Sequence, residues 1–92
     1  MFLCFLNNNI IKETFGEQAI YYFNIVNYSS YLLILKHDGG NNVAVYLIGC
    51  GFKNDIVIIP IQKNTYFNME IDNGNIKITS TLKYWTLNSF RF

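Results

Sequence analysis

Three runs of apolar residues occupy the middle of the chain, at residues 31–35 (YLLIL), 43–48 (VAVYLI) and 56–61 (IVIIPI). Each run has the length of a β-strand, and none alternates cleanly between apolar and polar positions. Because a strand with one face in water should alternate, these runs predict strands that have protein on both sides of their sheet. The first two runs flank the segment KHDGGNN, which predicts a β-hairpin that turns at Gly39-Gly40.

The dipeptide Asn73-Gly74 gives a second hairpin signal, because these residues favour a type I′ turn between two strands. Alternating runs flank this turn on both sides. Pairing across the turn sets Glu70 opposite Lys77 on a polar face and Ile71 opposite Ile76 on an apolar face. We expect the polar face to meet water and the apolar face to lie in the core.

The two ends of the chain also predict strands, at residues 1–6, 19–26 and 83–92. Residues 7–18 are more polar and show no sustained period, so they predict a connection. In the last stretch, the side of the strand that carries the apolar residues changes near Ser89, which indicates a β-bulge.

Pro60 has no amide donor, so we expect its strand to lie at the edge of a sheet or to be bulged there. In total, about eight short strands at regular spacing, with no substantial helix, predict an all-β protein. The expected architecture is a compact antiparallel β-sandwich or jelly roll, formed by a single domain over residues 1–92.

Apolar residues are more abundant than one small domain needs. Hydrophobic residues make up 51% of the 92 residues and charged residues only 14%, against a usual charged share of about 25%. A domain of this size buries only roughly 60 to 65% of the surface of its unfolded chain. Such an excess is typical of a permanent oligomer, whose interface resembles a core cut in half. We therefore predict an obligate homo-oligomer, with a trimer favoured, and an interface formed by Leu33, Leu35, Val45, Leu47, Ile58 and Phe92.

The net charge of +1 and the pI of about 7.7 provide no basic field for nucleic acid or an anionic membrane. The apolar start of the chain, MFLCFL, has no basic flank and is shorter than a signal-peptide core or a membrane span. We therefore expect neither nucleic-acid binding nor membrane insertion. Cys4 and Cys50 are expected to be buried free thiols, with one disulfide between them as the alternative.

Residues that carry catalysis or bind metals are sparse. His37 is the only histidine, and Asp38 beside it belongs to a turn in which Asp commonly forms local hydrogen bonds. A single histidine excludes a multi-histidine zinc site, and the six acidic residues lack EF-hand spacing. We predict no catalytic residue, metal ligand or cofactor, and we expect the chain not to be an enzyme. A small all-β enzyme subunit is the least favoured alternative.

Aromatic residues are the one surplus that suggests binding. They make up 17% of the chain, and seven tyrosines and one tryptophan exceed what so small a core can enclose. Exposed rings beside asparagine side chains suit stacking on sugars or anchoring a protein partner. The alternative is that the rings serve oligomer contacts and sheet packing. The candidate ligand-binding residues are Tyr22, Tyr28 and Tyr84.

From residue 31 onward, the order of these pieces resembles the small trimeric head domains that end many bacteriophage tail and head fibres. The matching pieces cover about two thirds of the chain. They are the apolar hairpin at 31–48, the corner Gly49-Cys50-Gly51, the strand at 56–61, the hairpin at 67–80 and the final Phe90-Arg91-Phe92. The resemblance implies a jelly roll of the tumour-necrosis-factor type, assembly as a trimer and binding to host-surface glycans or proteins.

The leading hypothesis is a non-enzymatic structural or adhesion protein of a phage virion, built as a homotrimeric fibre-head or decoration module. The alternative is a monomeric carbohydrate-binding module, which would be extracellular or cytoplasmic and soluble. The chain begins with its own methionine and shows no stalk. We therefore expect either a separate virion protein or an excerpt of a longer fibre.

Overall fold

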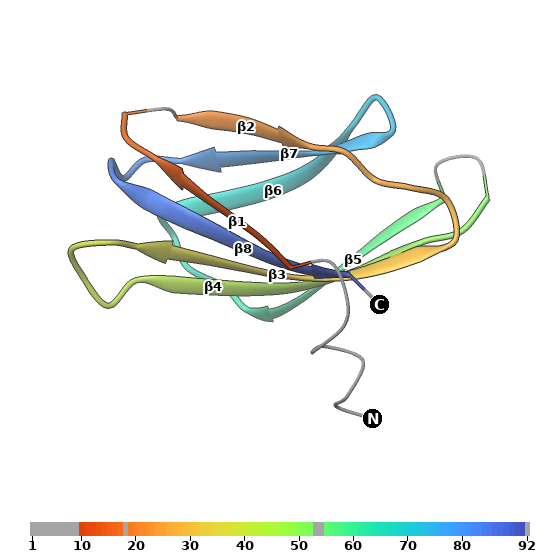
Figure 1. Ribbon diagram of the computed structural model, residues 1–92, viewed down its shortest axis with the longest axis horizontal. Helices are drawn as coiled ribbons and strands as arrows, with labels where there is room; N and C mark the ends of the chain where they lie inside the picture. The colour runs from red at the N-terminus through yellow and green to blue at the C-terminus, as the bar shows by residue number, and fades with distance from the viewer. Residues whose placement is uncertain (1–9, 18, 53–54, 92) are drawn as a thin grey trace.

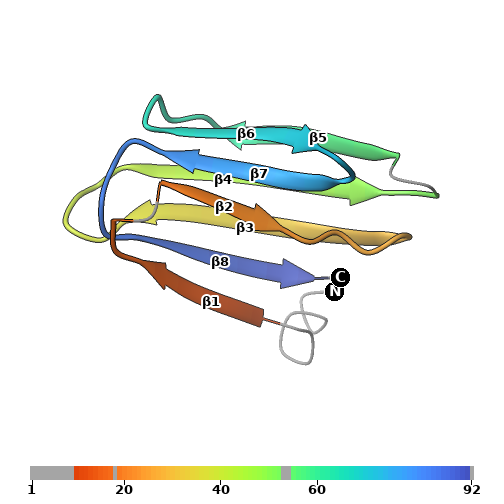
Figure 2. The same cartoon turned by 90° about the horizontal axis from the view of Figure 1, so that it is seen from above.

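Eight strands form two antiparallel sheets in the computed structural model of the protein, which describes residues 10–17, 19–52 and 55–91 (Figure 1). The larger sheet contains, in spatial order, β1 (Ile10–Phe15), β8 (Trp85–Arg91), β3 (Ser29–His37), β4 (Val43–Cys50) and β5 (Ile56–Gln62). The smaller sheet contains β2 (Ile20–Phe23), β7 (Asn75–Ser80) and β6 (Phe67–Asp72). The smaller sheet forms a layer above the larger one in Figure 1 and overlaps it in the view from above (Figure 2), so the prediction of an all-β antiparallel sandwich is confirmed.

The connections combine hairpins with longer crossings between the sheets. β3, β4 and β5 follow one another as neighbours in the larger sheet, and β6 and β7 form a hairpin in the smaller one. The chain ends pair at a distance in sequence, β1 with β8 and β2 with β7. The three central strands thus form a meander within one sheet, whereas a jelly roll is built from two Greek keys.

The hairpin around Asn73-Gly74 has the register that the sequence predicts. Asn73 and Gly74 both have positive φ, 56° and 80°, as a type I′ turn requires. Glu70 lies opposite Lys77 with 3.9 Å between their charged atoms, and Ile71 lies opposite Ile76. Ile76 is fully buried, but Ile71 is 49% exposed. The expectation that Ile71 lies in the core is therefore wrong, because β6 is an edge strand and Ile71 sits near its turn end.

The edge position of Pro60 is also confirmed. β5 is the last strand of the larger sheet and pairs with β4 alone among the described strands. The register shifts opposite Val45 and Tyr46, which pair with Gln62 and Pro60, so Ile61 is the extra residue of a bulge. The missing amide of Pro60 therefore leaves no gap in a central ladder.

Two predictions about the chain ends are wrong. Residues 10–15, expected to be a connection, form β1, which pairs with β8 from Ile10 opposite Phe90 to Phe15 opposite Trp85. The free edge of β8 supplies hydrogen-bond partners for the backbone of residues 10–15. The apolar and polar pattern of these residues does not indicate this pairing. No bulge interrupts β8, because its pairing with β3 continues without a shift and Ser89 is buried on the same side as Trp85. The predicted strand at residues 1–6 lies outside the described residues.

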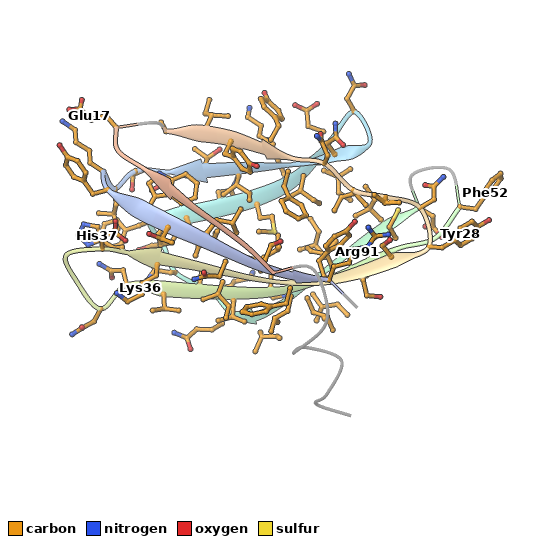
Figure 3. The ribbon with its side chains drawn as sticks, viewed as in Figure 1. Glu17, Tyr28, Lys36, His37, Phe52 and Arg91 are labelled. Atoms are coloured by element: carbon orange, nitrogen blue, oxygen red, sulfur yellow. The ribbon has the colours of Figure 1, made fainter. Side chains whose placement is uncertain are left out.

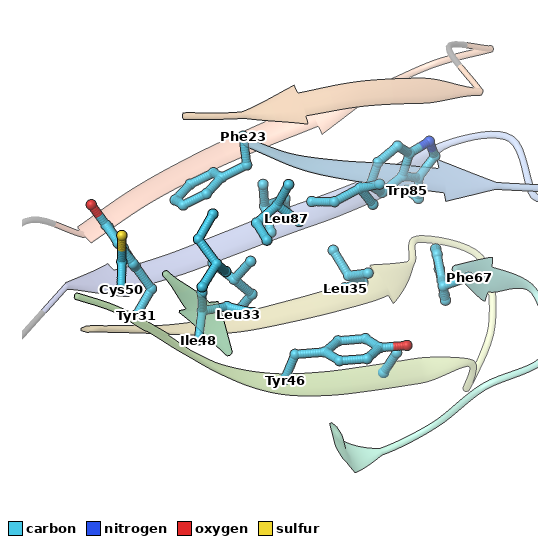
Figure 4. Packing of buried hydrophobic residues seen from close by; sticks show 14 residues of the cluster. Phe23, Tyr31, Leu33, Leu35, Tyr46, Ile48, Cys50, Phe67, Trp85 and Leu87 are labelled. Atoms are coloured by element: carbon cyan, nitrogen blue, oxygen red, sulfur yellow. The ribbon is translucent and has the colours of Figure 1, made fainter. Parts of the chain in front are cut away.

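The core lies between the two sheets (Figure 4) and takes aromatic side chains from both. Phe23 of β2 meets Tyr31 of β3 edge to face, with ring centroids 5.2 Å apart. Phe67 of β6 meets Trp85 of β8 with centroids 5.9 Å apart. The Tyr31 hydroxyl accepts the N–H of Val26 at 3.1 Å, so this buried phenol is also hydrogen-bonded. These contacts close the sandwich at both ends.

Candidate functional site

Two exposed aromatic rings lie side by side at one end of the sandwich (Figure 3). Tyr28 precedes β3, and Phe52 follows β4. Their ring centroids are 6.2 Å apart and their planes differ by 19°. Tyr28 is 75% exposed and Phe52 is 57% exposed. The rings therefore contact each other and still present most of their surface to solvent.

Backbone hydrogen bonds through Gly51 connect the two loops that carry these rings. The Gly51 carbonyl accepts the N–H of Tyr28 at 3.3 Å, and the Gly51 N–H donates to the carbonyl of Asp55 at 2.9 Å. The N–H of Asp55 donates to the carbonyl of Phe52 at 3.3 Å. Tyr28 has φ of 60°, a left-handed conformation that bulky residues seldom adopt. The Tyr28 ring is thus held outward by a strained but hydrogen-bonded backbone.

The larger sheet carries an apolar outer face, the side turned away from the smaller sheet. It is formed by alternate residues of four strands, and within the described residues no other strand covers its β3–β5 part (Figure 1). Leu32 lies opposite both Leu47 and Phe90 on this face, and Leu47 lies opposite Ile59. We call this surface the outer apolar face and define it by Leu32, Ile34, Val45, Leu47, Val57, Ile59 and Phe90.

A shallow groove of about 430 Å³ runs over part of the outer apolar face. It is lined by Leu47, Gly49, Val57 and Ile59, with Ser30 at one side. Gly49 has nothing within 4 Å of the position where a Cβ would lie, so the groove owes its depth partly to this missing side chain. The groove is therefore an apolar, open depression on a sheet surface, without charged groups among these residues.

The outer face of the smaller sheet is more polar. Asn68 lies opposite Thr79, and Glu70 lies opposite Lys77, as the hairpin register predicts. Tyr22 of β2 also lies on this face, opposite Lys77 on the other side of β7, and is half exposed. The two outer faces of the sandwich therefore differ in character, since one carries charges and amides and the other aliphatic side chains.

The end of the larger sheet opposite Tyr28 carries a hydrogen-bonded cluster around Asp38. Thr86 Oγ1 donates to Asp38 Oδ1 at 2.6 Å, and the Asp38 N–H donates to the carbonyl of Tyr84 at 2.8 Å. The Tyr84 N–H donates to the carbonyl of Gly16 at 2.6 Å. Nδ1 of His37 is buried here with no hydrogen-bond partner among the described residues. The side chain of Asp38 therefore bonds to a residue 48 positions away in the sequence, whereas the sequence predicted bonding within its own turn.

A second hollow, of about 350 Å³, lies where the edge strands β5 and β6 face each other. Tyr46, Pro60 and Phe67 are among its lining residues. Burial raises the pKa of the Tyr46 phenol above its ordinary value of 10.0, because the ionised form is disfavoured away from water. At neutral pH this phenol is therefore a neutral hydrogen-bonding group.

Residues with metal or redox chemistry form no cluster in the part of the chain that the structure describes, where no three His, Cys, Asp or Glu side chains could hold a metal ion. Cys50 is a buried free thiol, as expected, with its Sγ 3.8 Å from Asn27 Oδ1. Cys4 lies outside the described residues. No helix in residues 10–17, 19–52 or 55–91 is long and apolar enough to cross a membrane.

The three tyrosines predicted to bind ligand lie in three separate places. Tyr28 precedes β3, whereas Tyr84 contacts Asp38 just after β3, and the nine residues of this strand span about 30 Å. Tyr22 lies on the outer face of the smaller sheet. All three side chains are exposed. They do not form one site, and Tyr28 is the one found stacked on another exposed ring.

The predicted oligomer interface needs correction at Leu33, Leu35 and Ile58. Leu33 and Leu35 are fully buried between the sheets, and Ile58 packs against the same core. Leu33 and Leu35 are therefore not available to another subunit, and Ile58 is partly buried on the side of β5 that packs against the core. The opposite side of β3 carries Leu32 and Ile34, which point outward.

The other predicted interface residues have different positions. Val45 and Leu47 lie on the outward side of β4 and belong to the outer apolar face. Phe92 lies outside the described residues. The bulge predicted near Ser89 would have turned Phe90 to the other side of β8. Without that bulge, Phe90 faces outward, opposite Leu32.

Phe52 is the residue of the aromatic pair that the sequence did not single out. It stands in the segment between Gly51 and the next apolar run, where a lone phenylalanine gives no strand or helix pattern. The only available signal is that a large apolar residue in a glycine-rich corner has no strand face to bury it. Its proximity to Tyr28 depends on the long-range pairing of β3 with β4, with Ser29 opposite Cys50.

No family model matches the chain, and no curated protein matches its sequence. A solved structure matches its fold, that of a tailspike protein, a capsular polysaccharide depolymerase, from Acinetobacter baumannii bacteriophage Fri1. The chain shares its fold with part of a phage tailspike. The TM-score is 0.68 at 5% sequence identity, over 91% of this chain and 17% of the tailspike. The likeness therefore concerns the fold, and the chain spans about a sixth of the tailspike's length.

Proposed function

We propose that the chain is a non-enzymatic structural or adhesion module of a phage virion, which assembles as a homotrimer of the fibre-head or decoration type and contacts the host surface. The observation that carries the proposal is the fold match, since 91% of the chain superposes on part of a phage tailspike at a TM-score of 0.68. The match supports the expectation, raised by the order of the sequence elements, of a protein from phage tails.

The outer apolar face supports the homotrimer. Val57 and Ile59 are each about half exposed on it, and the neighbouring Leu32 and Leu47 extend it across the sheet. Leaving such a face in water costs about 25 cal/mol for each Å² of apolar surface that a partner subunit could cover. Only 14% of the residues are charged, so few charged side chains oppose the association of this face with another subunit. Packing of three such faces around an axis would give the central strands protein on both sides.

The environment of the carboxylates supports a non-enzymatic role. Glu70 and Glu17 face Lys77 and Lys83 at 3.9 Å and 3.7 Å, and Asp38 accepts the hydroxyl of Thr86. Catalysis of glycoside hydrolysis usually needs two carboxylates that flank one sugar bond. These three acids instead have partners of their own. The depolymerase activity named for the tailspike belongs to a chain of which this one corresponds to 17%.

The decisive experiment is light scattering on the purified protein, coupled to gel filtration, with two lysine variants. Ile59 and Ile71 are both 49% exposed, but Ile59 belongs to the outer apolar face and Ile71 to the edge strand β6. We expect a trimer for the wild-type protein, dissociation of Ile59→Lys and an unchanged trimer for Ile71→Lys. A wild-type monomer of 10.7 kDa that persists at high concentration would contradict the proposal.

A monomeric carbohydrate-binding module is the second candidate function. The exposed Tyr28–Phe52 pair favours it, because aromatic side chains at a loop tip suit ligand binding without any assembly. The same scattering measurement separates the two candidates, since only the first requires a trimer.

A further inference from the structure

We propose that Tyr28 and Phe52 form a stacking platform for a sugar ring of a surface polysaccharide. The host-surface origin of that polysaccharide rests on the proposed adhesion function, whereas the platform itself rests on the geometry of the two rings. Both rings come from loops at one end of the sandwich and point away from it (Figure 3).

The relative position of the rings leaves a wide aromatic surface open. A centroid distance of 6.2 Å is too long for a full face-to-face stack, in which ring planes lie about 3.5 Å apart. The rings therefore overlap mainly at their edges and form a step. Much of the surface of both residues is open to solvent, since Tyr28 is 75% exposed and Phe52 57%. A sugar ring, which has one face of C–H groups, matches such a surface in size and polarity.

Backbone hydrogen bonds hold the two loops that carry the rings beside each other. Tyr28 is held at φ of 60°, a conformation that is unfavourable for an L-residue with a bulky side chain. Its N–H is bound to the carbonyl of Gly51, the residue before Phe52. Strained residues of this kind are concentrated at binding sites, where the surrounding structure maintains them. A preformed platform also avoids the entropy cost of ordering two side chains on binding.

Polar neighbours favour a sugar over an apolar peptide as the ligand. Asn27 precedes Tyr28 and is exposed, and Asp55 is exposed in the loop that carries Phe52. Asp55 Oδ2 lies 3.4 Å from the position that a Cβ on Gly51 would occupy, so the carboxylate is close to the base of the platform. Amide and carboxylate groups beside an aromatic surface can bind sugar hydroxyls. A protein anchor would instead be expected within a larger apolar patch.

The test is binding of the labelled protein to an array of purified bacterial capsular polysaccharides and O-antigen polysaccharides. Tyr28→Asn removes the ring and keeps a residue that tolerates positive φ. Tyr84→Asn is the matched control, because Tyr84 is 57% exposed with φ of 57° at the other end of the sheet. We expect at least a tenfold loss of affinity for Tyr28→Asn and for Phe52→Ala, and none for Tyr84→Asn. Circular dichroism melting confirms that all three variants are folded.

The outcomes separate this proposal from the proposed function. A trimer that binds no polysaccharide of the array overturns the platform and leaves the assembly proposal standing. The same holds if the variants Tyr28→Asn and Phe52→Ala bind a polysaccharide as tightly as the wild-type trimer does. A monomer that binds a polysaccharide and loses it in both variants supports the platform and overturns the trimer. Loss of binding in Tyr84→Asn to the same extent would also overturn the platform, because it would show that any exposed ring has this effect.

Discussion

Gly40 approaches the imidazole of His37 so closely that a Cβ on Gly40 would lie 2.9 Å from His37 Nδ1. Neither Gly39 nor Gly40 has a positive φ, so the hairpin between β3 and β4 does not need glycine for its backbone conformation. The close approach to a half-buried ring explains the glycine at position 40 instead. Gly40→Ala should force the ring to move and lower the free energy of unfolding by about 1–3 kcal/mol.

Gly39→Ala is the control for this prediction. Its Cβ would meet His37 Cε1 at 3.8 Å, an ordinary contact. Restriction of the unfolded chain should then make Gly39→Ala neutral or stabilising by up to about 1 kcal/mol. Urea unfolding of both variants measures the difference. The explanation fails if the two alanines have the same effect, or if His37→Ser does not relieve the cost at position 40.

The two isoleucines that face each other near the Asn73-Gly74 turn should respond differently to charge. Ile76→Asp places an unpaired carboxylate in the core and should prevent folding. Ile71→Asp leaves its carboxylate in water on the edge strand, so we expect a loss of less than about 1 kcal/mol. Circular dichroism and thermal melting distinguish these results. Equal losses would contradict the burial difference across this hairpin.

Local signals were sufficient to predict the hairpin around Asn73-Gly74 and the edge position of Pro60. Asn73-Gly74 combines a turn that requires positive φ with alternation on both sides, so register and facing follow together. Pro60 likewise has few acceptable positions in a sheet, and the structure places it on an edge strand at a bulge. In these elements a single residue pair or a single missing amide restricts the backbone strongly.

The orientation of β3 was not predictable in the same way. Leu32 and Leu33 are equally apolar, and the sequence does not say which side of the strand faces the smaller sheet. Long-range pairing decides it, because Leu33 lies opposite the buried Ser89 and Leu32 opposite the outward Phe90. β1 was not predicted for the same reason, because its pairing partner β8 is at the other end of the chain.

Of the two residues of the aromatic platform, only Tyr28 was predicted from the sequence. The surplus of tyrosines pointed to Tyr28 among three candidates, but nothing in the sequence favours it over Tyr22 or Tyr84. The preference comes from Phe52, which is 24 residues further along and is brought beside Tyr28 when β3 pairs with β4. A site built from two loops is therefore visible only once the register of the strands between them is known.

Alkaline pH should destabilise the protein through Tyr46. Burial raises the pKa of this phenol in the folded state, so its contribution is fully present below the ordinary value of 10.0. It is lost as the pH rises through the raised pKa, because the unfolded state ionises first. Melting temperatures measured between about pH 8 and about pH 11 should fall less for Tyr46→Phe than for the wild-type protein. Tyr22→Phe, which alters a half-exposed ring, should follow the wild-type curve.

Adjacent leucines of β3 provide the sharpest test of how the central strands are used. Leu33 is fully buried between the sheets, so Leu33→Asn should abolish folding at any protein concentration. Leu32 belongs to the outer apolar face, and Leu32→Asn should leave a folded subunit that assembles poorly. In an assembling protein each tenfold dilution costs about 1.4 kcal/mol per association step, so the melting temperature falls on dilution. We expect this concentration dependence for the wild-type protein and its loss in Leu32→Asn. A wild-type melting temperature that does not change over a hundredfold dilution, with Leu32→Asn melting at the same temperature, would mean that the outer apolar face has no partner subunit.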